Sequence, residues 1–227
     1  MIITIDGPAA AGKSTLAKGL AKALNWICLD SGATYRAAAL LAIENGIDLD
    51  DAPACAALLR KASIELSIAQ DGETMVFLNN RNVSVEIRTD RVSEAASRIS
   101  IHPQVRAELV ILQRKIAEGK DIIAEGRDMG SVVFPHADFK IYLDAPIDER
   151  AIRRKNELQN EGSDMSIGEI IERLETRDRR DKNRKASPLV QTPDSLYLNN
   201  GNLQKEETLK LALKVIQEVL DMKILSD

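Results

Sequence analysis

Gly7-Pro8-Ala9-Ala10-Ala11-Gly12-Lys13-Ser14 decides the fold class of this chain of 227 residues. The stretch matches the pattern G-x-x-x-x-G-K-[ST] and lies between a β-branched run, Ile2–Ile5, and a helix-forming segment, Thr15–Leu24. A strand, a glycine loop and a helix start are what a phosphate-binding loop requires, because small residues let backbone N–H groups converge on phosphates. We expect the Lys13 ammonium to reach the β- and γ-phosphates and the Ser14 hydroxyl to ligate Mg²⁺. The loop therefore predicts that a nucleoside triphosphate binds, but it leaves the reaction undefined.

Composition and charge exclude some classes of function. The chain is 44% hydrophobic and 29% charged, and its net charge is −4, which argues against a protein that coats nucleic acid. Cys28 and Cys55 show no metal-type spacing, so we expect two buried, reduced thiols. No apolar stretch approaches the ~18 residues of a membrane helix. We expect a cytoplasmic monomer with neither a membrane nor a nucleic-acid partner.

Four short apolar runs predict the strands of a parallel sheet. Helix-forming segments separate them, as in βαβ units, so the fold class is α/β with a parallel sheet flanked by helices. The runs are Ile2–Ile5, Trp26–Leu29, Ile122–Ala124 and Phe139–Leu143. Each is followed by polar residues, namely Asp6-Gly7, Asp30-Ser31-Gly32, Glu125-Gly126-Arg127-Asp128 and Asp144. Because ligands bind at the carboxyl ends of parallel strands, we expect these residues to line one site.

Two segments interrupt the βα pattern. The runs Ile64–Ile68, Met75–Leu78 and Val83–Ile87, with turns at Asp71-Gly72 and Asn79–Asn82, predict a three-stranded antiparallel insertion. The segment Glu149–Lys185 is highly charged and helical, and Ser166-Ile167-Gly168-Glu169 is a capping box that opens one of its helices. Near the end of the chain, Leu203–Leu220 is an amphipathic helix that we expect to pack on the sheet.

Basic residues gather at the end of the charged helical segment. Between Arg173 and Lys185 there is a local surplus of four positive charges, although the whole chain is acidic. On a continuous helix Leu174, Arg177, Asp181 and Arg184 share one side. One guanidinium group can bind two phosphate oxygens at the same time, so this side of the helix is suited to closing over a polyphosphate. Phosphoryl transfer needs positioning and charge neutralisation, and a phosphate-monoester acceptor needs no general base, which agrees with a chain that has only two histidines.

The motifs together resemble those of the bacterial cytidylate kinases, a group of nucleoside-monophosphate kinases. The stretches that carry the resemblance follow one another along almost the whole chain. They are Gly7–Thr15, Asp30–Arg36, Ala95-Ala96-Ser97, Pro103–Arg106, Gly126–Pro135 and Arg177–Arg184. At Leu198-Asn199-Asn200 the chain departs from the family pattern, in which many members carry an acidic and a hydroxyl residue.

The resemblance implies a P-loop nucleoside-monophosphate kinase fold in one domain, 1–227, that converts ATP and CMP or dCMP to ADP and CDP or dCDP with Mg²⁺. Its core would be residues 1–30, 105–148 and 186–227, its monophosphate-binding region residues 31–104 with the antiparallel insertion at 62–88, and its helical lid residues 149–185. It further implies that Gly7–Thr15 bind ATP, with Ser14 on Mg²⁺, and that Lys13, Arg127, Arg177 and Arg184 are catalytic.

The acceptor-site roles also come from the resemblance. Three residues, Ser97, Arg106 and Asp128, resemble those that read the cytosine edge. Ser31 and Asp181 resemble the pentose contacts, with Tyr35 nearby. The clamp on the acceptor phosphate is resembled by Arg36, Arg127 and Arg184. A carboxylate accepts a hydrogen bond from the cytosine amino group, whereas uracil has a carbonyl there. Such a buried mismatch costs about 1–3 kcal/mol, so CMP should be preferred over UMP about ten- to a hundredfold.

Two alternatives stay open at this point. The first is another small-molecule P-loop kinase that acts on UMP, AMP or a hydroxyl acceptor, and an alcohol acceptor would favour a catalytic base near the transfer site. The second is a GTP-dependent switch or a nucleic-acid-binding module. The guanine-reading pattern N-K-x-D is absent, and aromatic residues make up only 3% of the chain, which leaves few stacking platforms.

Overall fold

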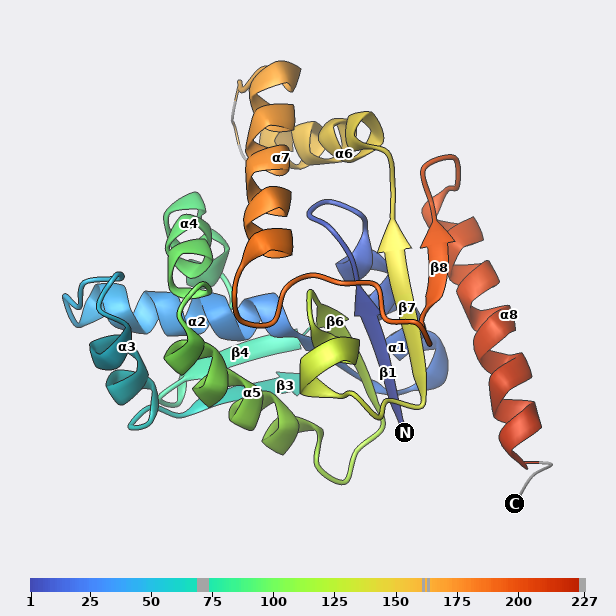
Figure 1. The fold of residues 1–227 in the computed structure, drawn as a ribbon, viewed down its shortest axis with the longest axis horizontal. Coiled ribbons are helices and arrows are strands. Elements are labelled where there is room, and N and C mark those ends of the chain that lie inside the picture. Colours follow the sequence, from blue (N-terminus) through green and yellow to red (C-terminus); the bar gives the residue numbers. More distant parts are fainter. Residues whose placement is uncertain (69–73, 161, 163, 225–227) are drawn as a thin grey trace.

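A five-stranded parallel sheet forms the centre of the computed structural model, which describes residues 1–68, 74–160, 162 and 164–224 (Figure 1). The strand order is β2-β6-β1-β7-β8. The strands are β1 (Ile2–Asp6), β2 (Ile27–Asp30), β6 (Ile122–Gly126), β7 (Phe139–Asp144) and β8 (Leu196–Asn199). All four predicted parallel strands are confirmed, and β8 is a fifth that the sequence reading missed. β1 lies in the middle, so the glycine loop that follows it opens at the centre of the sheet's carboxyl edge.

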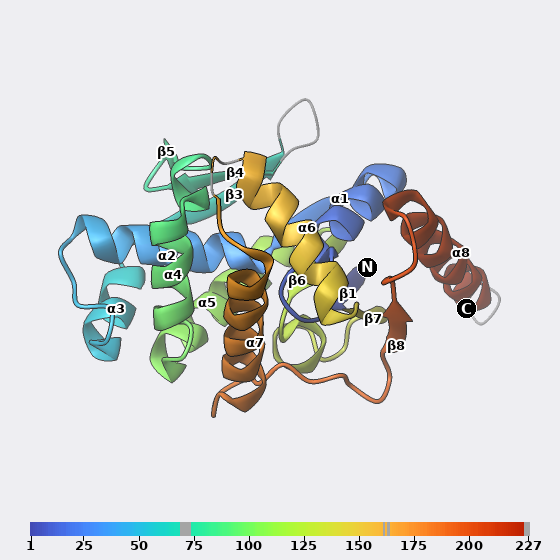
Figure 2. The same ribbon diagram turned by 90° about the horizontal axis from the view of Figure 1, so that it is seen from above.

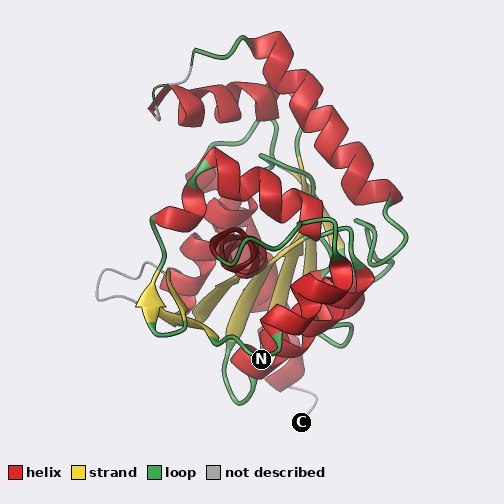
Figure 3. Cartoon of the chain, turned by 90° about the vertical axis from the view of Figure 1, so that its left-hand side faces the viewer, coloured by secondary structure: helices red, strands yellow, loops and turns green. Residues whose placement is uncertain are grey.

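Helices cover both faces of this sheet (Figure 3). The helices are α1 (Lys13–Leu24), α2 (Ser31–Glu44), α3 (Ala52–Leu59), α4 (Asp90–Ile99), α5 (Pro103–Ala117), α6 (Ile147–Asn160), α7 (Ile167–Asn183) and α8 (Lys205–Ile224). Leu20 of α1 and Ile216 of α8 share a core cluster with Ile5 of β1, as expected for the C-terminal amphipathic helix. A separate core cluster contains Ala117 of α5, Ile122 of β6 and residues of the π-helical turn η2 (Met129–Val133). Among the described residues, no helix is long and apolar enough to cross a membrane.

The predicted antiparallel insertion exists, but its third strand is not where the sequence put it. β3 (Ile64–Ile68) pairs with β4 (Thr74–Leu78), and β4 pairs with a two-residue strand, β5 (Arg81–Asn82). The turn between β4 and β5 is Asn79-Asn80, and both residues have positive φ, as a tight hairpin requires. The expected Asp71-Gly72 turn lies outside the described residues.

The prediction of a strand at Val83–Ile87 is wrong for a local reason. The Ser84 hydroxyl accepts a hydrogen bond from the Val76 amide at 2.9 Å, so a side chain replaces the backbone partner that a continuing strand would supply. The chain then turns into the 3₁₀ helix η1 (Glu86–Arg88). Val83 and Ile87 are still fully buried, which explains why the sequence pattern looked like that of a strand.

The helices α6 and α7 stand over the carboxyl edge of the parallel sheet (Figures 1 and 2). The predicted capping box opens α7, because the Ser166 and Glu169 side chains each bond to the other residue's backbone. Apolar residues of this pair, Leu158 of α6 and Leu174 of α7 among them, pack around Ala9 of the glycine loop. The charged helical segment thus lies against the loop at which we expect the phosphates to bind.

Candidate active site

The glycine loop is held closely against the neighbouring strand. A Cβ atom at Gly7 would lie 1.9 Å from the Leu143 carbonyl oxygen, so only glycine fits there. The Lys13 ammonium donates to the Pro8 carbonyl at 2.6 Å and thereby closes the loop on itself. Burial, reinforced by the nearby charge of Arg127, lowers the pKa of Lys13 to about 7. A bound polyphosphate would supply the anionic partner that this ammonium lacks.

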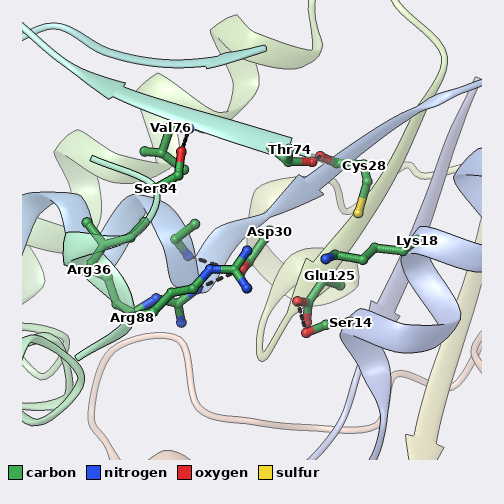
Figure 4. A pocket seen from close by; sticks show the side chains of 12 residues that line it. Ser14, Lys18, Cys28, Asp30, Arg36, Thr74, Val76, Ser84, Arg88 and Glu125 are labelled. Carbon is green, nitrogen blue, oxygen red and sulfur yellow. Dashed lines mark hydrogen bonds and ion pairs between the residues drawn. The ribbon is translucent and has the colours of Figure 1, made fainter. Parts of the chain in front are cut away.

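A hydroxyl and a carboxylate meet beside the loop, at the ends of α1 and β6 (Figure 4). Ser14 Oγ donates to Glu125 Oε1 at 2.5 Å, and burial raises the pKa of Glu125. Oxygen ligands of this kind suit Mg²⁺, which keeps several waters and takes the phosphate oxygens of its substrate. The described residues contain no group of three or more His, Cys, Asp or Glu side chains that could hold a metal ion. Ser14 and Glu125 are therefore the residues that would hold Mg²⁺, whose charge would offset that of the phosphates.

A buried ion pair from the charged helical segment grips the tip of the loop, and the sequence analysis did not foresee it. Arg150 of α6 donates to Asp178 of α7 at 2.6 Å and to the Ala9 carbonyl at 2.9 Å. The other Asp178 oxygen accepts from the Ala9 amide at 3.0 Å. Two consecutive helices that are far from the glycine loop along the chain thus bind both backbone groups of one loop residue, Ala9.

The opposite flank of the loop is held by Asn200, which ends the stretch Leu198-Asn199-Asn200 where the sequence departs from the family pattern. Its Nδ2 donates to the Ala11 carbonyl at 3.1 Å, and its Oδ1 accepts from Arg153 at 3.1 Å. Arg153 also donates to the Asn200 carbonyl at 2.9 Å. The amide side chain suits this arrangement, since its NH₂ group donates while its oxygen accepts.

Two of the three residues predicted to read the base, Arg106 and Asp128, form one buried cluster. Arg106 of α5 donates to Asp128 Oδ2, and both side chains are almost fully buried. The Arg106 guanidinium lies 5.3 Å from the centre of the Tyr35 ring, a cation–π contact. The other Asp128 oxygen, Oδ1, lies 3.8 Å from Arg184. Ser97 takes a different partner, because its hydroxyl accepts from Arg180 of α7 at 2.5 Å.

The predicted phosphate-clamp residues are oriented by carboxylates. Arg127 bonds to Asp181 at 2.8 Å, Arg184 lies 3.7 Å from the other Asp181 oxygen, and Arg36 bonds to Asp30 at 2.7 Å. Burial opposes the charge of Asp181, but Arg127 and Arg177 outweigh it and hold the pKa of Asp181 below its ordinary value. Figure 4 shows Arg36 reaching Asp30 beside the Ser14–Glu125 pair.

Arg177 and Ser31 complete the predicted set. Arg177 has an exposed surface, yet the protein around it displaces much of the bulk water. This desolvation, together with the like charge of Arg127, lowers the pKa of Arg177 to about 10. Ser31 is packed so tightly on Gly126 that a Cβ there would lie 2.4 Å from its hydroxyl oxygen. Thr15 lies exposed in the first turn of α1, beside Ser14.

Several guanidinium groups of this cluster keep unused hydrogen-bond donors. Arg36 Nε, Arg106 Nε and Arg184 Nη2 are buried and have no hydrogen-bond partner among the described residues. Buried donors without partners are costly, and at a binding site a ligand can satisfy them. The arrangement is therefore suited to an anionic ligand that also offers hydrogen-bond acceptors.

Comparison with known proteins identifies the relatives of this chain. A family model described as cytidylate kinase matches residues 3–218. A cytidylate kinase from Pasteurella multocida (strain Pm70) is 44% identical over 223 residues, 98% of this chain and 98% of that protein. A cytidylate kinase from Actinobacillus succinogenes is 45% identical over 224 residues, 96% of this chain and 98% of that protein. The crystal structure of an uncharacterized protein from Eubacterium ventriosum covers 96% of this chain and 98% of its own at a TM-score of 0.52 and 13% identity, which shows a shared fold alone.

Proposed function

The chain belongs to the cytidylate kinase family, and from this premise we propose that it transfers the γ-phosphoryl group of ATP to CMP and dCMP with Mg²⁺. The family itself makes the protein a nucleotide kinase that phosphorylates CMP. The finer proposal concerns the donor, the cation, the deoxy substrate and the residue roles. The observation that carries it is a set of buried guanidinium donors that have no hydrogen-bond partner in the described structure. They belong to Arg106 and Arg184, beside the Asp128 carboxylate, and to Arg36, beside Asp30.

On the donor side, the glycine loop and Lys13 bind the polyphosphate. Phosphates would draw the Lys13 ammonium from the Pro8 carbonyl and restore its charge, because an anion raises the pKa of a neighbouring amine. Arg177 projects towards the same region and adds positive charge where the transferring group develops negative charge. Residues 149–185 act as the lid in this proposal.

On the acceptor side, the Arg106–Asp128 pair recognises cytosine. Because Asp128 Oδ2 is engaged by Arg106, Oδ1 is the atom that accepts from the cytosine amino group. Arg106 Nε is the matching donor for an acceptor on the same base edge. Arg36, Arg127 and Arg184 then hold the acceptor phosphate, and the acids Asp30 and Asp181 keep these guanidinium groups oriented. Ser31, Tyr35 and Asp181 line the pentose, and Ser97 joins the base contacts after Arg180 releases it.

A coupled assay with an acceptor panel tests this proposal. We expect CMP and dCMP to be phosphorylated efficiently, and UMP about ten- to a hundredfold less so, because a buried hydrogen-bond mismatch costs about 1–3 kcal/mol. AMP and shikimate should be poor acceptors. Turnover of UMP or shikimate above that of CMP would contradict the assignment of the base-reading residues. Full activity in the presence of a chelator and without added Mg²⁺ would contradict the proposed requirement for Mg²⁺.

A further inference from the structure

Asp6 is a buried carboxylate at the end of β1, next to the first residue of the glycine loop. It is only 5% exposed. One of its oxygens accepts from the Met129 amide at 2.9 Å, and the other accepts from the Gly130 amide at 2.7 Å. Both amides belong to the turn η2, which lies on the acceptor side of the site. The Asp6 side chain therefore joins two parts of the site that are more than 120 residues apart along the chain.

The turn that Asp6 holds leads directly into the acceptor-binding residues. Asp128 is the residue that precedes η2, and Arg127 comes just before it. Gly130 lies so close to β1 that a Cβ atom there would be 2.8 Å from Thr4 Oγ1. A shift of this turn would therefore move the Asp128 carboxylate relative to the glycine loop.

We infer that Asp6 is a positioning residue, which fixes the acceptor-binding turn at the distance from the glycine loop that phosphoryl transfer requires. The inference rests on the proposed acceptor roles of Arg127 and Asp128. Its physical basis is that reacting groups must be held within a few tenths of an ångström for in-line transfer, and covalent continuity fixes only the donor side of Asp6.

The energetics separate this role from a merely structural one. Burial raises the pKa of Asp6 from 3.8 to about 6; the bonds to Gly130 and Met129 oppose this shift. The charged and titratable groups around it are Asp128, which raises the pKa further, Lys13, which lowers it, and the Tyr142 phenol. When the pKa of a carboxyl group is higher in the folded than in the unfolded state, the folded protein loses stability as the pH rises past the unfolded pKa. Ionised Asp6 therefore lowers the stability of the fold at neutral pH. A residue kept only for stability would not carry this charge.

The decisive variant is Asp6→Asn, which keeps the shape, removes the charge and presents an NH₂ group to one of the two amides. We expect the melting temperature to stay close to that of the unmodified protein, because relief of the buried charge opposes the cost of the new donor–donor contact. We expect the KM for CMP to rise about tenfold or more, with a smaller preference for CMP over UMP, because a hydrogen bond to a charged group is lost. The Kd for ATP should stay within about threefold, because the glycine loop and Lys13 are unchanged.

Asp138→Asn is the matched control. Asp138 also accepts from a backbone amide of β1, that of Ile2 at 2.7 Å, but at the end of the strand remote from the site. This control should keep the KM for CMP. Asp6→Asn with an unchanged KM for CMP, or with equal losses for ATP and CMP at a lowered melting temperature, would overturn the inference.

Two further measurements test the role of Asp6 if the variant does not fold and separate that role from the proposed function. Should Asp6→Asn not fold, amide hydrogen exchange of the unmodified protein without nucleotide decides: slow exchange at Met129 and Gly130 supports the inference, and exchange at unprotected rates overturns it. The acceptor panel separates the proposed function, because failure of the unmodified protein to use CMP refutes that function, whereas normal CMP turnover by Asp6→Asn refutes only the role of Asp6.

Discussion

Replacing Asp128 by asparagine should exchange the preferred pyrimidine. Arg106 fixes the orientation of residue 128, because its guanidinium donates to Oδ2 in a pair whose side chains are 3% and 4% exposed. In Asp128→Asn the single amide oxygen must stay on Arg106, since a guanidinium cannot accept. The amide NH₂ then takes the place of Oδ1 and faces the base. It opposes the amino group of cytosine and matches the carbonyl of uracil.

The size of the effect comes from the burial of this pair. A polar group left unsatisfied in such a place costs about 1–3 kcal/mol, or about ten- to a hundredfold in kcat/KM. The substitution lowers kcat/KM for CMP by this factor and adds a hydrogen bond to UMP. The ratio of kcat/KM for CMP to that for UMP should therefore fall from about 10–100 to about 1 or below. Removing the carboxylate also weakens the pair with Arg106, and the loss of stability should be less than the about 3–5 kcal/mol of a fully broken buried pair.

The assay is kcat/KM for CMP and UMP, measured at saturating ATP and together with thermal unfolding. Asp194→Asn is the matched control, because Asp194 pairs with the buried Lys140 at 2.7 Å outside the predicted site residues. It should leave the ratio of the two acceptors unchanged. An Asp128→Asn protein that is folded and keeps its CMP-to-UMP ratio within about twofold, against the loss expected for a buried mismatch, would refute the reasoning.

Other perturbations test the donor side. Lys13→Ala should lower kcat about a hundredfold or more and leave the Kd for CMP in calorimetry within about threefold; equal losses would contradict a donor-side role. Burial lowers the pKa of Lys13 to about 7, so ATP binding at about pH 8 should take up a proton, seen as an enthalpy that varies with the buffer, and a buffer-independent enthalpy would argue against it. Gly7→Ala places a methyl group 1.9 Å from the Leu143 oxygen and should abolish ATP binding, as measured by fluorescence titration. Asp178→Ala leaves Arg150 buried without its carboxylate and should lower the free energy of unfolding in urea by about 3–5 kcal/mol; a change below about 1 kcal/mol would speak against the pair.

The parallel sheet could be read from the sequence because its signals are local. Runs such as Ile122–Ala124 are buried on both faces, so they appear as unbroken apolar stretches. β8 escaped because it is a short edge strand in which Leu198 is buried while Tyr197 and Asn199 are exposed, so its apolar run is brief. The prediction of a strand at Val83–Ile87 failed in the opposite way. Only the Val83 amide bonds to a backbone carbonyl of β4 and the chain then turns into η1, but the burial of Val83 and Ile87 produces the same sequence pattern as a strand.

For the candidate site, sequence patterns predicted which charged side chains gather at the carboxyl edge of the sheet, but not how they pair. The acids at strand ends and the arginines at helical spacing mark which side chains face the site, but a spacing along the chain does not say which cation meets which anion. Pairs such as Arg150 with Asp178, or Ser97 with Arg180, depend on how α7 lies against the rest of the fold. Asp6 was visible only as a polar residue after a strand, and its two amide partners come from a turn whose shape the sequence does not encode locally.

The pairing of three arginines with acids explains how an acidic protein can keep the proposed anion-binding site ready. Arg106, Arg127 and Arg36 each use part of their guanidinium on a carboxylate, which holds the group in place and reduces the cost of its burial. Arg36 and Arg106 keep a buried Nε donor unpaired, so a phosphate or a base edge adds a bond without displacing one. Because the donors are fixed before the ligand arrives, little reorganisation is left for the transition state, where the charge on the transferring group is largest. The carboxylates of this site therefore serve the binding of anions by fixing the cations that make it.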